Sequence, residues 1–265
     1  MITEFNDKTA LRNYFKSDII NSCYHMADLN DDNFSRCRWL VKEEGGVISS
    51  VLLVYSHPKA TTILSLGGDP GFKEIIEGYG DGLPASFYFH LFDDHMPVAR
   101  DLLAVRNVHP FYRMYVRRIN LSDRVNDTGG IRQLKNADHK LIADLLLHHP
   151  GNFFTNGMLR TGYYYGIIRH GKLAAMAGIH VFSEDDGIAV LGNVVTREEY
   201  RNKGYSERCV RHLVNVLMDK VDVIALNVKT DNTAAIRVYE KIGFKKHSAL
   251  HIGCASIRKD TTPPA

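Results

Sequence analysis

The chain has 265 residues, of which 45% are apolar and 24% are charged, a balance typical of a folded globular protein with a sizeable core. It has no apolar run near the ~20 residues that span a bilayer, and its acidic N-terminus, 1–7, lacks the basic start and apolar core of a signal peptide. We therefore expect a cytoplasmic protein without membrane binding. Its four cysteines have no paired spacing, which argues against a zinc site and a disulfide framework, so no metal is expected.

The charge is uneven along the chain. Residues 1–128 hold 14 Lys and Arg against 17 Asp and Glu, and residues 129–265 hold 19 against 13. A basic C-terminal half suits a polyanionic ligand, although a solvated mixed surface explains this small excess equally well. Because the chain has neither a Lys/Arg run nor a stacked-aromatic pattern, we do not expect it to bind nucleic acid.

The first half alternates apolar strands with turns. Strands are predicted over 35–42, 47–56 and 61–66, followed by the glycine loop Gly67–Gly71 and a helix that starts near Phe72. The loop has no cation, so it is a poor cradle for a phosphate. It is either an ordinary strand-to-helix connection or part of a degenerate copy of a structural unit that the second half of the chain repeats.

The second half is more regular. A polar, glycine-ended stretch, 123–130, predicts a linker between domains 1–125 and 129–258, and residues 259–265 predict a disordered tail. The remaining expected elements are strand 131–134, helix 139–149, strands 163–169, 173–182 and 188–195, a helix with Val210, Leu213, Val214 and Leu217 on one face, strand 221–228, a helix with Ala235, Val238, Tyr239 and Ile242 on one face, and strand 251–258.

A basic glycine loop separates strand 188–195 from the helix behind it. It reads Arg-Asn-Lys-Gly-Tyr-Ser over residues 201–206. Arg201 offers a planar fork and Lys203 a mobile point charge, while Gly204 allows the backbone to approach a ligand closely. The unpaired N–H groups and the macrodipole of the helix start favour an anion. The loop therefore predicts a diphosphate site, although an ordinary surface turn would explain the loop if it stood alone.

A second motif opens the last helix. It begins at Asn232, reaches Tyr239 and stops at Gly243-Phe244. Asn232 either caps the helix or contacts a ligand, and Tyr239 is either a core aromatic or a polar group of the site. The two motifs together resemble the R/Q-x-x-G-x-G/A and N-x-x-A-x-x-x-Y-x-x-x-G-F patterns of the GCN5-related N-acetyltransferase (GNAT) superfamily, its FR47-like branch above all. Ser206 stands where the first pattern has Gly or Ala.

The resemblance covers roughly residues 131–258 and implies an α+β (mixed α/β) fold. This GNAT acyl-CoA N-acyltransferase fold has a central mixed, mostly antiparallel sheet flanked by helices. The first half would then be a degenerate GNAT-like lobe, an arrangement similar to that of the glycine N-acyltransferases. The implied co-substrate is acetyl-CoA or another acyl-CoA, and the residues that the resemblance places against it are Val194, Val195, Arg201, Asn202, Lys203, Gly204, Tyr205, Ser206, Asn232 and Tyr239.

The resemblance also implies direct attack of an amine on the acetyl carbonyl, with Tyr239 protonating the departing thiolate. Many members carry a glutamate in the strand before the glycine loop, but 188–195 has no acid. The candidate bases are His180 and the turn 184–186, and a water relay is the alternative. The expected acceptor is a small-molecule or peptide amine, the chain being either a monomer or a homodimer. A non-catalytic acyl-CoA sensor or scaffold is the second hypothesis.

Overall fold

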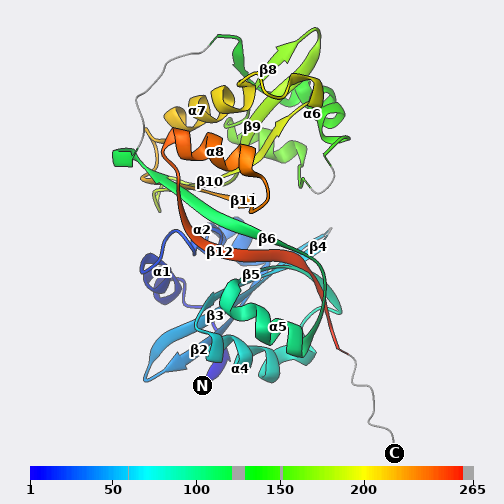
Figure 1. The fold of residues 1–265 in the computed structure, drawn as a ribbon. Coiled ribbons are helices and arrows are strands. Elements are labelled where there is room, and N and C mark those ends of the chain that lie inside the picture. The colour runs from blue at the N-terminus through cyan, green and yellow to red at the C-terminus, as the bar shows by residue number, and fades with distance from the viewer. Residues whose placement is uncertain (59, 121–128, 150–151, 259–265) are drawn as a thin grey trace, which may run out of the picture. The chain divides into compact units, whose positions relative to one another are not determined.

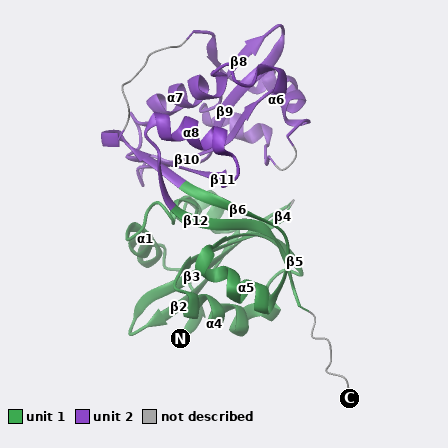
Figure 2. Ribbon diagram, in the orientation of Figure 1, with its two compact units in different colours: residues 1–113, 248–265 green, residues 114–247 purple. Residues whose placement is uncertain are grey.

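A computed structural model describes residues 1–58, 60–120, 129–149 and 152–258. These residues form two compact units, one made of residues 1–113 together with the segment from Ser248 onward, the other of residues 114–247 (Figure 2). Most of the stretch predicted to be a linker, 123–128, and the tail 259–265 lie outside the described residues.

The first unit is a mainly antiparallel sheet with helices packed on it (Figure 1). Its elements are β1 (Ile2–Glu4), α1 (Lys8–Lys16), α2 (Cys23–Ala27), α3 (Asp31–Phe34), β2 (Cys37–Glu44), β3 (Val47–His57), β4 (Ala60–Gly67), α4 (Asp69–Tyr79), β5 (Ser86–Phe92), α5 (Met96–Leu102), β6 (Leu103–Arg117) as far as Arg113, and β12 (Lys245–Ile257) from Ser248. The strand order is β1-β2-β3-β4-β5-β12-β6. Strands β4 and β5 are parallel, whereas β1–β2, β2–β3, β3–β4 and β5–β12 are antiparallel.

The core of this unit lies between α4, α5 and the sheet. Phe72 and Ile75 of α4 are buried against Leu40, Leu52 and Phe89 from three different strands. Because successive residues of a strand point to opposite faces, the alternating apolar residues of β5 supply one side of that core. The predicted strands and the helix start near Phe72 are confirmed within a few residues.

The second unit contains the sequence motifs. Its elements are the end of β6 (Leu103–Arg117), β7 (Ile131–Gln133), α6 (His139–Leu146), β8 (Tyr165–Arg169), β9 (Lys172–Ser183), β10 (Ile188–Thr196), α7 (Tyr205–Leu217), β11 (Val223–Lys229), α8 (Thr233–Ile242) and the start of β12 (Lys245–Ile257). The strand order is β6-β11-β10-β9-β8-β7; β10 and β11 are parallel, and β7–β8, β8–β9 and β9–β10 are antiparallel. Helix α7 packs on β8, β9 and β10, and α8 packs against α7. The predicted mixed, mostly antiparallel sheet flanked by helices is confirmed.

The two units share one sequence of elements. In each, two antiparallel hairpin connections join three strands, a glycine turn then leads into a helix, and the next strand pairs in parallel with the third. Both parallel pairs are short, Thr62–Leu64 with Tyr88–His90 in one unit and Ile188–Leu191 with Val223–Leu226 in the other.

Several boundaries differ from the predicted ones for physical reasons. The last strand begins at Lys245 rather than 251, because its polar first residues, which show no apolar alternation, still take strand conformation. Helix α6 ends at Leu146 rather than 149. Within the described part of the chain, none of the helices combines the length and apolarity needed to cross a membrane.

His25 of α2 is a titratable group sealed inside the first unit. Its side chain is 2% exposed, and its Nε2 lies 3.4 Å from the carbonyl oxygen of Leu64. Burial lowers the pKa of His25 to about 3, so the ring is neutral in the folded protein at every pH near neutrality. Asp28, one turn later, behaves in the opposite way, because burial raises the pKa of its carboxyl to about 7.

Acidification should therefore destabilise the first unit through His25. Between pH 7 and pH 5 the unfolded imidazole, with a pKa near ~6.5, takes up a proton that the folded one does not, which costs about 2 kcal/mol of unfolding free energy. The measurement is urea unfolding at both pH values, followed by fluorescence of Trp39, the one tryptophan, whose buried ring lies 5.7 Å from Phe15. The fall in unfolding free energy from pH 7 to pH 5 should be about 2 kcal/mol smaller in His25→Phe than in the unaltered protein. Asp28 is present in both proteins, so its contribution cancels from the comparison. Equal losses in the two proteins would contradict the assignment.

Candidate functional site

The parallel strands β10 and β11 separate part of the way along their length. Their pairing ends at Leu191 and Leu226, while β10 continues to Thr196 paired only with β9. From Gly192 onward, the edge of β10 that faces β11 therefore has no ladder partner in β11. Val194 and Val195 lie on this separated segment, the side chain of Val195 being buried and that of Val194 half-buried. The Val195 side chain packs in the core, and the unpaired strand edge is the feature that an extended ligand can use.

Two β-bulges follow each other along the β9–β10 ladder near the point where β10 separates from β11, one on each strand. Val190 pairs with Val181 but Leu191 with Ile179, so His180 is an extra residue on β9. Gly192 pairs with Gly178 but Val195 with Met176, so Asn193 and Val194 together oppose a single residue. Bulges of this kind redirect side chains and end regular pairing, and they are common beside active sites.

His180 projects from the first of these bulges. Its side chain is reached by solvent, yet the protein around its ring lowers the pKa of the imidazole to about 4 by desolvation, while a hydrogen-bonding contribution from Asn193 opposes that shift. The ring lies directly over Gly192, where an added Cβ would stand 2.2 Å from its Cδ2. A neutral imidazole is therefore held at the start of the strand separation at pH 7.

A buried polar network surrounds Asn193. Its Nδ2 donates to the carbonyl oxygen of Phe153 (3.1 Å) and to the hydroxyl of Tyr164 (3.0 Å), which donates to the carbonyl oxygen of Ile179 (2.9 Å). Burial raises the pKa of Tyr164 to about 12, so this hydroxyl stays protonated. Asn193 was not predicted as a site residue, although the Gly192-Asn193 pair inside an apolar strand is a turn-forming dipeptide and thus a bulge signal.

The glycine loop leaves the start of α7 open. Gly204 has a φ of 72°, makes no side-chain cap and has no atom within 4 Å of an added Cβ. The first intrahelical bond runs from the Arg208 amide to the Gly204 carbonyl, so the amides of Tyr205 and Ser206 have no acceptor within the helix. Backbone N–H groups therefore face outward at this helix start, as an anion site requires.

The cations of the loop are placed on its surface. Arg201 is 53% exposed, with the Glu198 carboxylate 3.9 Å from its guanidinium. Lys203 donates to the Glu199 carbonyl oxygen at 3.0 Å and lies 5.2 Å from the centre of the Tyr200 ring. Asn202 has a φ of 60°, which turns the chain between the two cations. Tyr200 was not predicted as a site residue.

Helix α8 presents the second motif. The Oδ1 of Asn232 accepts from the Ala235 amide at 3.1 Å, so Asn232 caps the helix as one of its two predicted roles requires. Tyr239 is 6% exposed, and its ring centroid lies 5.7 Å from that of Phe244. Burial raises the pKa of Tyr239, so its hydroxyl keeps its proton at neutral pH.

The acids weighed as alternative bases have other partners. Glu184 lies 3.3 Å from the Lys220 ammonium, and Asp186 accepts from the Ser183 hydroxyl at 2.8 Å. Both lie in the turn before Ile188, the end of β10 opposite to the strand separation. In the part of the chain that the structure describes, no cluster of three or more His, Cys, Asp or Glu could hold a metal ion.

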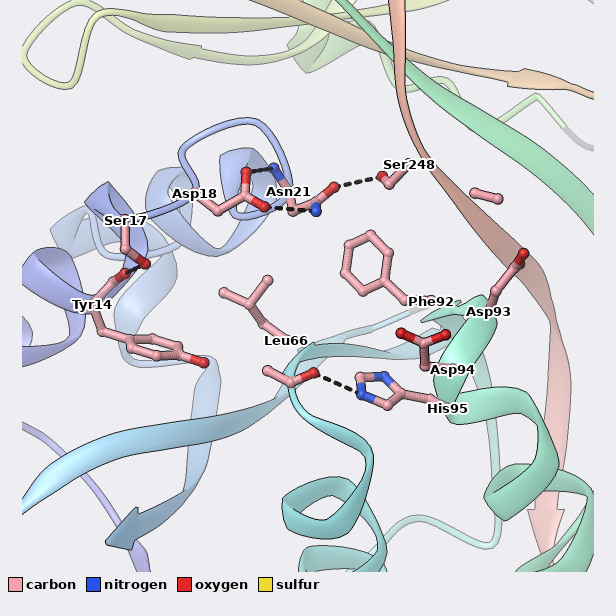
Figure 3. A pocket seen from close by; sticks show the side chains of 12 residues that line it. Tyr14, Ser17, Asp18, Asn21, Leu66, Phe92, Asp93, Asp94, His95 and Ser248 are labelled. Atoms are coloured by element: carbon pink, nitrogen blue, oxygen red, sulfur yellow. Dashed lines mark hydrogen bonds between the residues drawn. The ribbon is translucent and has the colours of Figure 1, made fainter. Parts of the chain in front are cut away.

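The first unit has a pocket at its own parallel strand pair, with a volume of about 390 Å³ (Figure 3). Asp18, Asp93 and Asp94 line it, without any Lys or Arg among the lining residues. The glycine turn beside it is closed, because a Cβ on Gly67 would lie 2.4 Å from the carbonyl oxygen of Ser49. Carboxylates and a closed turn do not suit a diphosphate, in contrast to the loop at Gly204.

Comparisons of the sequence with known proteins match a part of the chain that lies in the second unit. Residues 134–244 match the acetyltransferase (GNAT) family. Over 100 residues, 37% of this chain, the sequence is 29% identical to the [ribosomal protein bS18]-alanine N-acetyltransferase of Escherichia coli K12, and this match spans 60% of that relative's length.

Solved structures extend the likeness to the whole fold. A GCN5-related N-acetyltransferase from Sphaerobacter thermophilus superimposes with a TM-score of 0.64 at 12% identity, over 98% of this chain and 96% of that one. A tandem GNAT protein from the clavulanic acid biosynthesis pathway gives a TM-score of 0.58 at 12% identity, over 98% and 99%. At these identities the two structures show the fold alone.

Gly178, which packs against the Tyr164 ring of the polar network, should be needed for stability. In Gly178→Ala the new Cβ would lie 2.2 Å from a ring carbon of the buried Tyr164, so we expect a loss of about 1–3 kcal/mol in unfolding free energy. The control is Gly80→Ala at the end of α4, where φ is −54° and nothing lies within 4 Å, with an expected change within about 0.5 kcal/mol. Urea unfolding followed by circular dichroism measures both, and an unchanged midpoint for Gly178→Ala would show that Tyr164 moves freely.

Proposed function

We propose that this chain, whose residues 134–244 match the acetyltransferase (GNAT) family, transfers an acetyl group from acetyl-CoA to a primary amine. The observation that carries the proposal is the combination of an uncapped helix start at Gly204 with the unpaired edge of β10. The first provides N–H donors for a diphosphate, and the second provides a strand edge for an extended amide-bearing arm.

The residues present fit acetyl-CoA as co-substrate. The amides of Gly204, Tyr205 and Ser206 would hold the diphosphate, with Arg201 and Lys203 adding charge from the loop. The backbone at Val194 and Val195 would hold the pantetheine arm. When bound, the cofactor supplies a thioester carbonyl that is open to attack by an amine.

Tyr239 is proposed as the proton donor to the departing thiolate. Its hydroxyl is protonated throughout the physiological range because burial raises its pKa. Burial is the one cause of this rise, and no hydrogen bond from the described residues contributes to it, so we propose that the hydroxyl donates its proton to a ligand. A positioned acid of this kind typically contributes about 10²–10⁴-fold to a rate.

His180 is proposed as the group that receives the proton of the attacking nitrogen. Its ring is neutral at pH 7 and stands at the strand separation, next to Gly192. A weak base is sufficient if the proton leaves as the new carbon–nitrogen bond forms, because the nitrogen then becomes more acidic. This assignment supplies the base that the acid-free strand β10 lacks.

The acceptor is proposed to be a small-molecule or peptide amine, in the FR47-like branch of the family. The Escherichia coli relative is named for an alanine of a ribosomal protein, which supports a peptide α-amine as one candidate class. The first unit is proposed to be a degenerate copy of the second. The shared order of elements and the fold of the tandem GNAT protein support that reading.

Reversing the charge of the loop should weaken cofactor binding. Arg201→Glu places a carboxylate where the diphosphate is proposed to lie, so the Kd for acetyl-CoA should rise by about 10- to 100-fold. Isothermal titration calorimetry measures it, with Arg36→Glu, an exposed arginine of the first unit, as the charge-matched control. Equal affinities for the two variants would remove Arg201 from the site, and failure of the unaltered protein to bind at millimolar acetyl-CoA would remove the proposed function.

Removing the Tyr239 hydroxyl separates catalysis from binding. Tyr239→Phe keeps the ring that packs near Phe244 and deletes the proposed acid, so kcat should fall about 100-fold while the Kd for acetyl-CoA is kept. Release of free thiol in the presence of a panel of primary amines gives the rate. Binding without thiol release by the unaltered protein would instead favour the acyl-CoA sensor, whose motivation is the missing strand carboxylate.

A further inference from the structure

Asn193 has a backbone conformation that asparagine adopts at a cost. Its φ is 53°, it lies inside a strand, and it is 4% exposed. A left-handed conformation at a residue other than glycine costs roughly 1–2 kcal/mol, so the surrounding bonds have to enforce it. The bulge that it shares with Val194 coincides with the point where β10 leaves β11.

The amide of Asn193 is held in one orientation. Both hydrogens of Nδ2 are used, one on the carbonyl oxygen of Phe153 and one on the hydroxyl of Tyr164. A flipped amide would point its oxygen at the Phe153 carbonyl, which cannot donate, so the positions of oxygen and nitrogen follow from the network. The Oδ1 is thereby aimed away from both partners.

That Oδ1 is buried and makes no hydrogen bond within the described part of the chain. A buried acceptor without a donor lowers the free energy of unfolding by about 1–3 kcal/mol, so a hydrogen bond from a nearby donor would stabilise it. His180 stands beside this acceptor, because its ring lies over Gly192, the residue before Asn193, where an added Cβ would lie 2.3 Å from the ring Nε2. Gly192 leaves the room in which the His180 ring lies.

We propose that Asn193 is a positioning residue for His180, its Oδ1 accepting the N–H of one ring nitrogen so that the other is presented, unprotonated, to the amine. The inference rests on the proposed function for its catalytic meaning. In the step it prepares, an N–H bond of the attacking nitrogen breaks and the proton passes to the free ring nitrogen. The electron pair of that bond stays on the nitrogen, whose original lone pair forms the bond to the acetyl carbon. The carbon–sulfur bond of the thioester breaks, and its electron pair leaves with the thiolate, which would take its proton from Tyr239.

Few charged groups disturb this pair. Desolvation and Asn193 are the two influences on the pKa of His180, and no charged side chain of the described residues adds to them. Tyr164, the titratable member of the network, is neutral because its pKa is about 12. A change at position 193 should therefore be read out at His180 without interference from a third group.

Two variants separate the backbone of Asn193 from its amide. Asn193→Gly keeps a residue that takes a positive φ without strain and removes the acceptor, whereas Asn193→Asp keeps the shape and replaces a neutral amide by a carboxylate. The first readout, independent of activity, is the pair of ring ¹⁵N shifts of His180 at pH 7, assigned by comparison with His180→Gln. We expect one fixed tautomer in the unaltered protein and a mixture of tautomers in Asn193→Gly.

The second readout is the pH profile. In Asn193→Asp the new negative charge should raise the pKa of His180, so that its titration and the acid limb of kcat/KM both move to higher pH by at least one unit. In Asn193→Gly, kcat should fall about tenfold or more with the Kd for acetyl-CoA unchanged. Tyr164→Phe removes one of the two acceptors that orient the amide. It should lower kcat and mix the His180 tautomers as Asn193→Gly does, but to a smaller extent, and it provides a second test if Asn193→Asp does not fold.

The inference is overturned if His180 shows the same tautomer and titration in all of these variants. A loss of stability alone, without movement of the His180 titration, would assign Asn193 to the fold only. If the unaltered protein does not acetylate any amine, the proposed function fails, whereas the ¹⁵N shifts still decide whether Asn193 holds His180.

Discussion

The early end of the β10–β11 ladder is the constraint on which the rest of the second unit depends. Parallel strands normally keep their slanted hydrogen bonds along their shared length. Here pairing stops after Leu191 and Leu226, and the bulge at Asn193 and Val194 holds β10 on β9 instead. The strand edge that this leaves unpaired lies beside the imidazole of His180 on β9, and the chain that leaves β10 at its C-terminal end leads to the open helix start at Gly204.

The motif regions were predictable because their chemistry is local. A glycine among cations before an amphipathic stretch predicts an open helix start, and an asparagine before an apolar helix face predicts a cap; Gly204 and Asn232 have those conformations. The strands on either side follow from valine-rich runs with turn residues between them. These elements depend on interactions within about a dozen residues.

The paired bulges were not predictable in the same way. His180 and Asn193 belong to different strands, and they approach each other only because each strand carries its extra residues near the same place in the register. In a single sequence the glycine-asparagine pair indicates an irregular strand, but it does not indicate that His180 of the neighbouring strand lies beside it. Similarly, α1, α2 and β6 of the first unit have weak local patterns and are fixed by long-range contacts such as those of Arg113 with the carbonyl oxygens of Ile20 and Asn21.

The first unit is discontinuous in sequence, since Ser248 to Ile257 supply a strand beside β5 and Ala255 supplies part of its core. A chain emerging from the ribosome has therefore made all of residues 1–113 long before that strand exists. The uninterrupted middle segment can collapse during synthesis, while the sheet of the first unit has to wait for residues 248–257. A nonsense mutation at the codon for Ser248 would thus damage the unit built from residues 1–113 more than the unit built from residues 114–247.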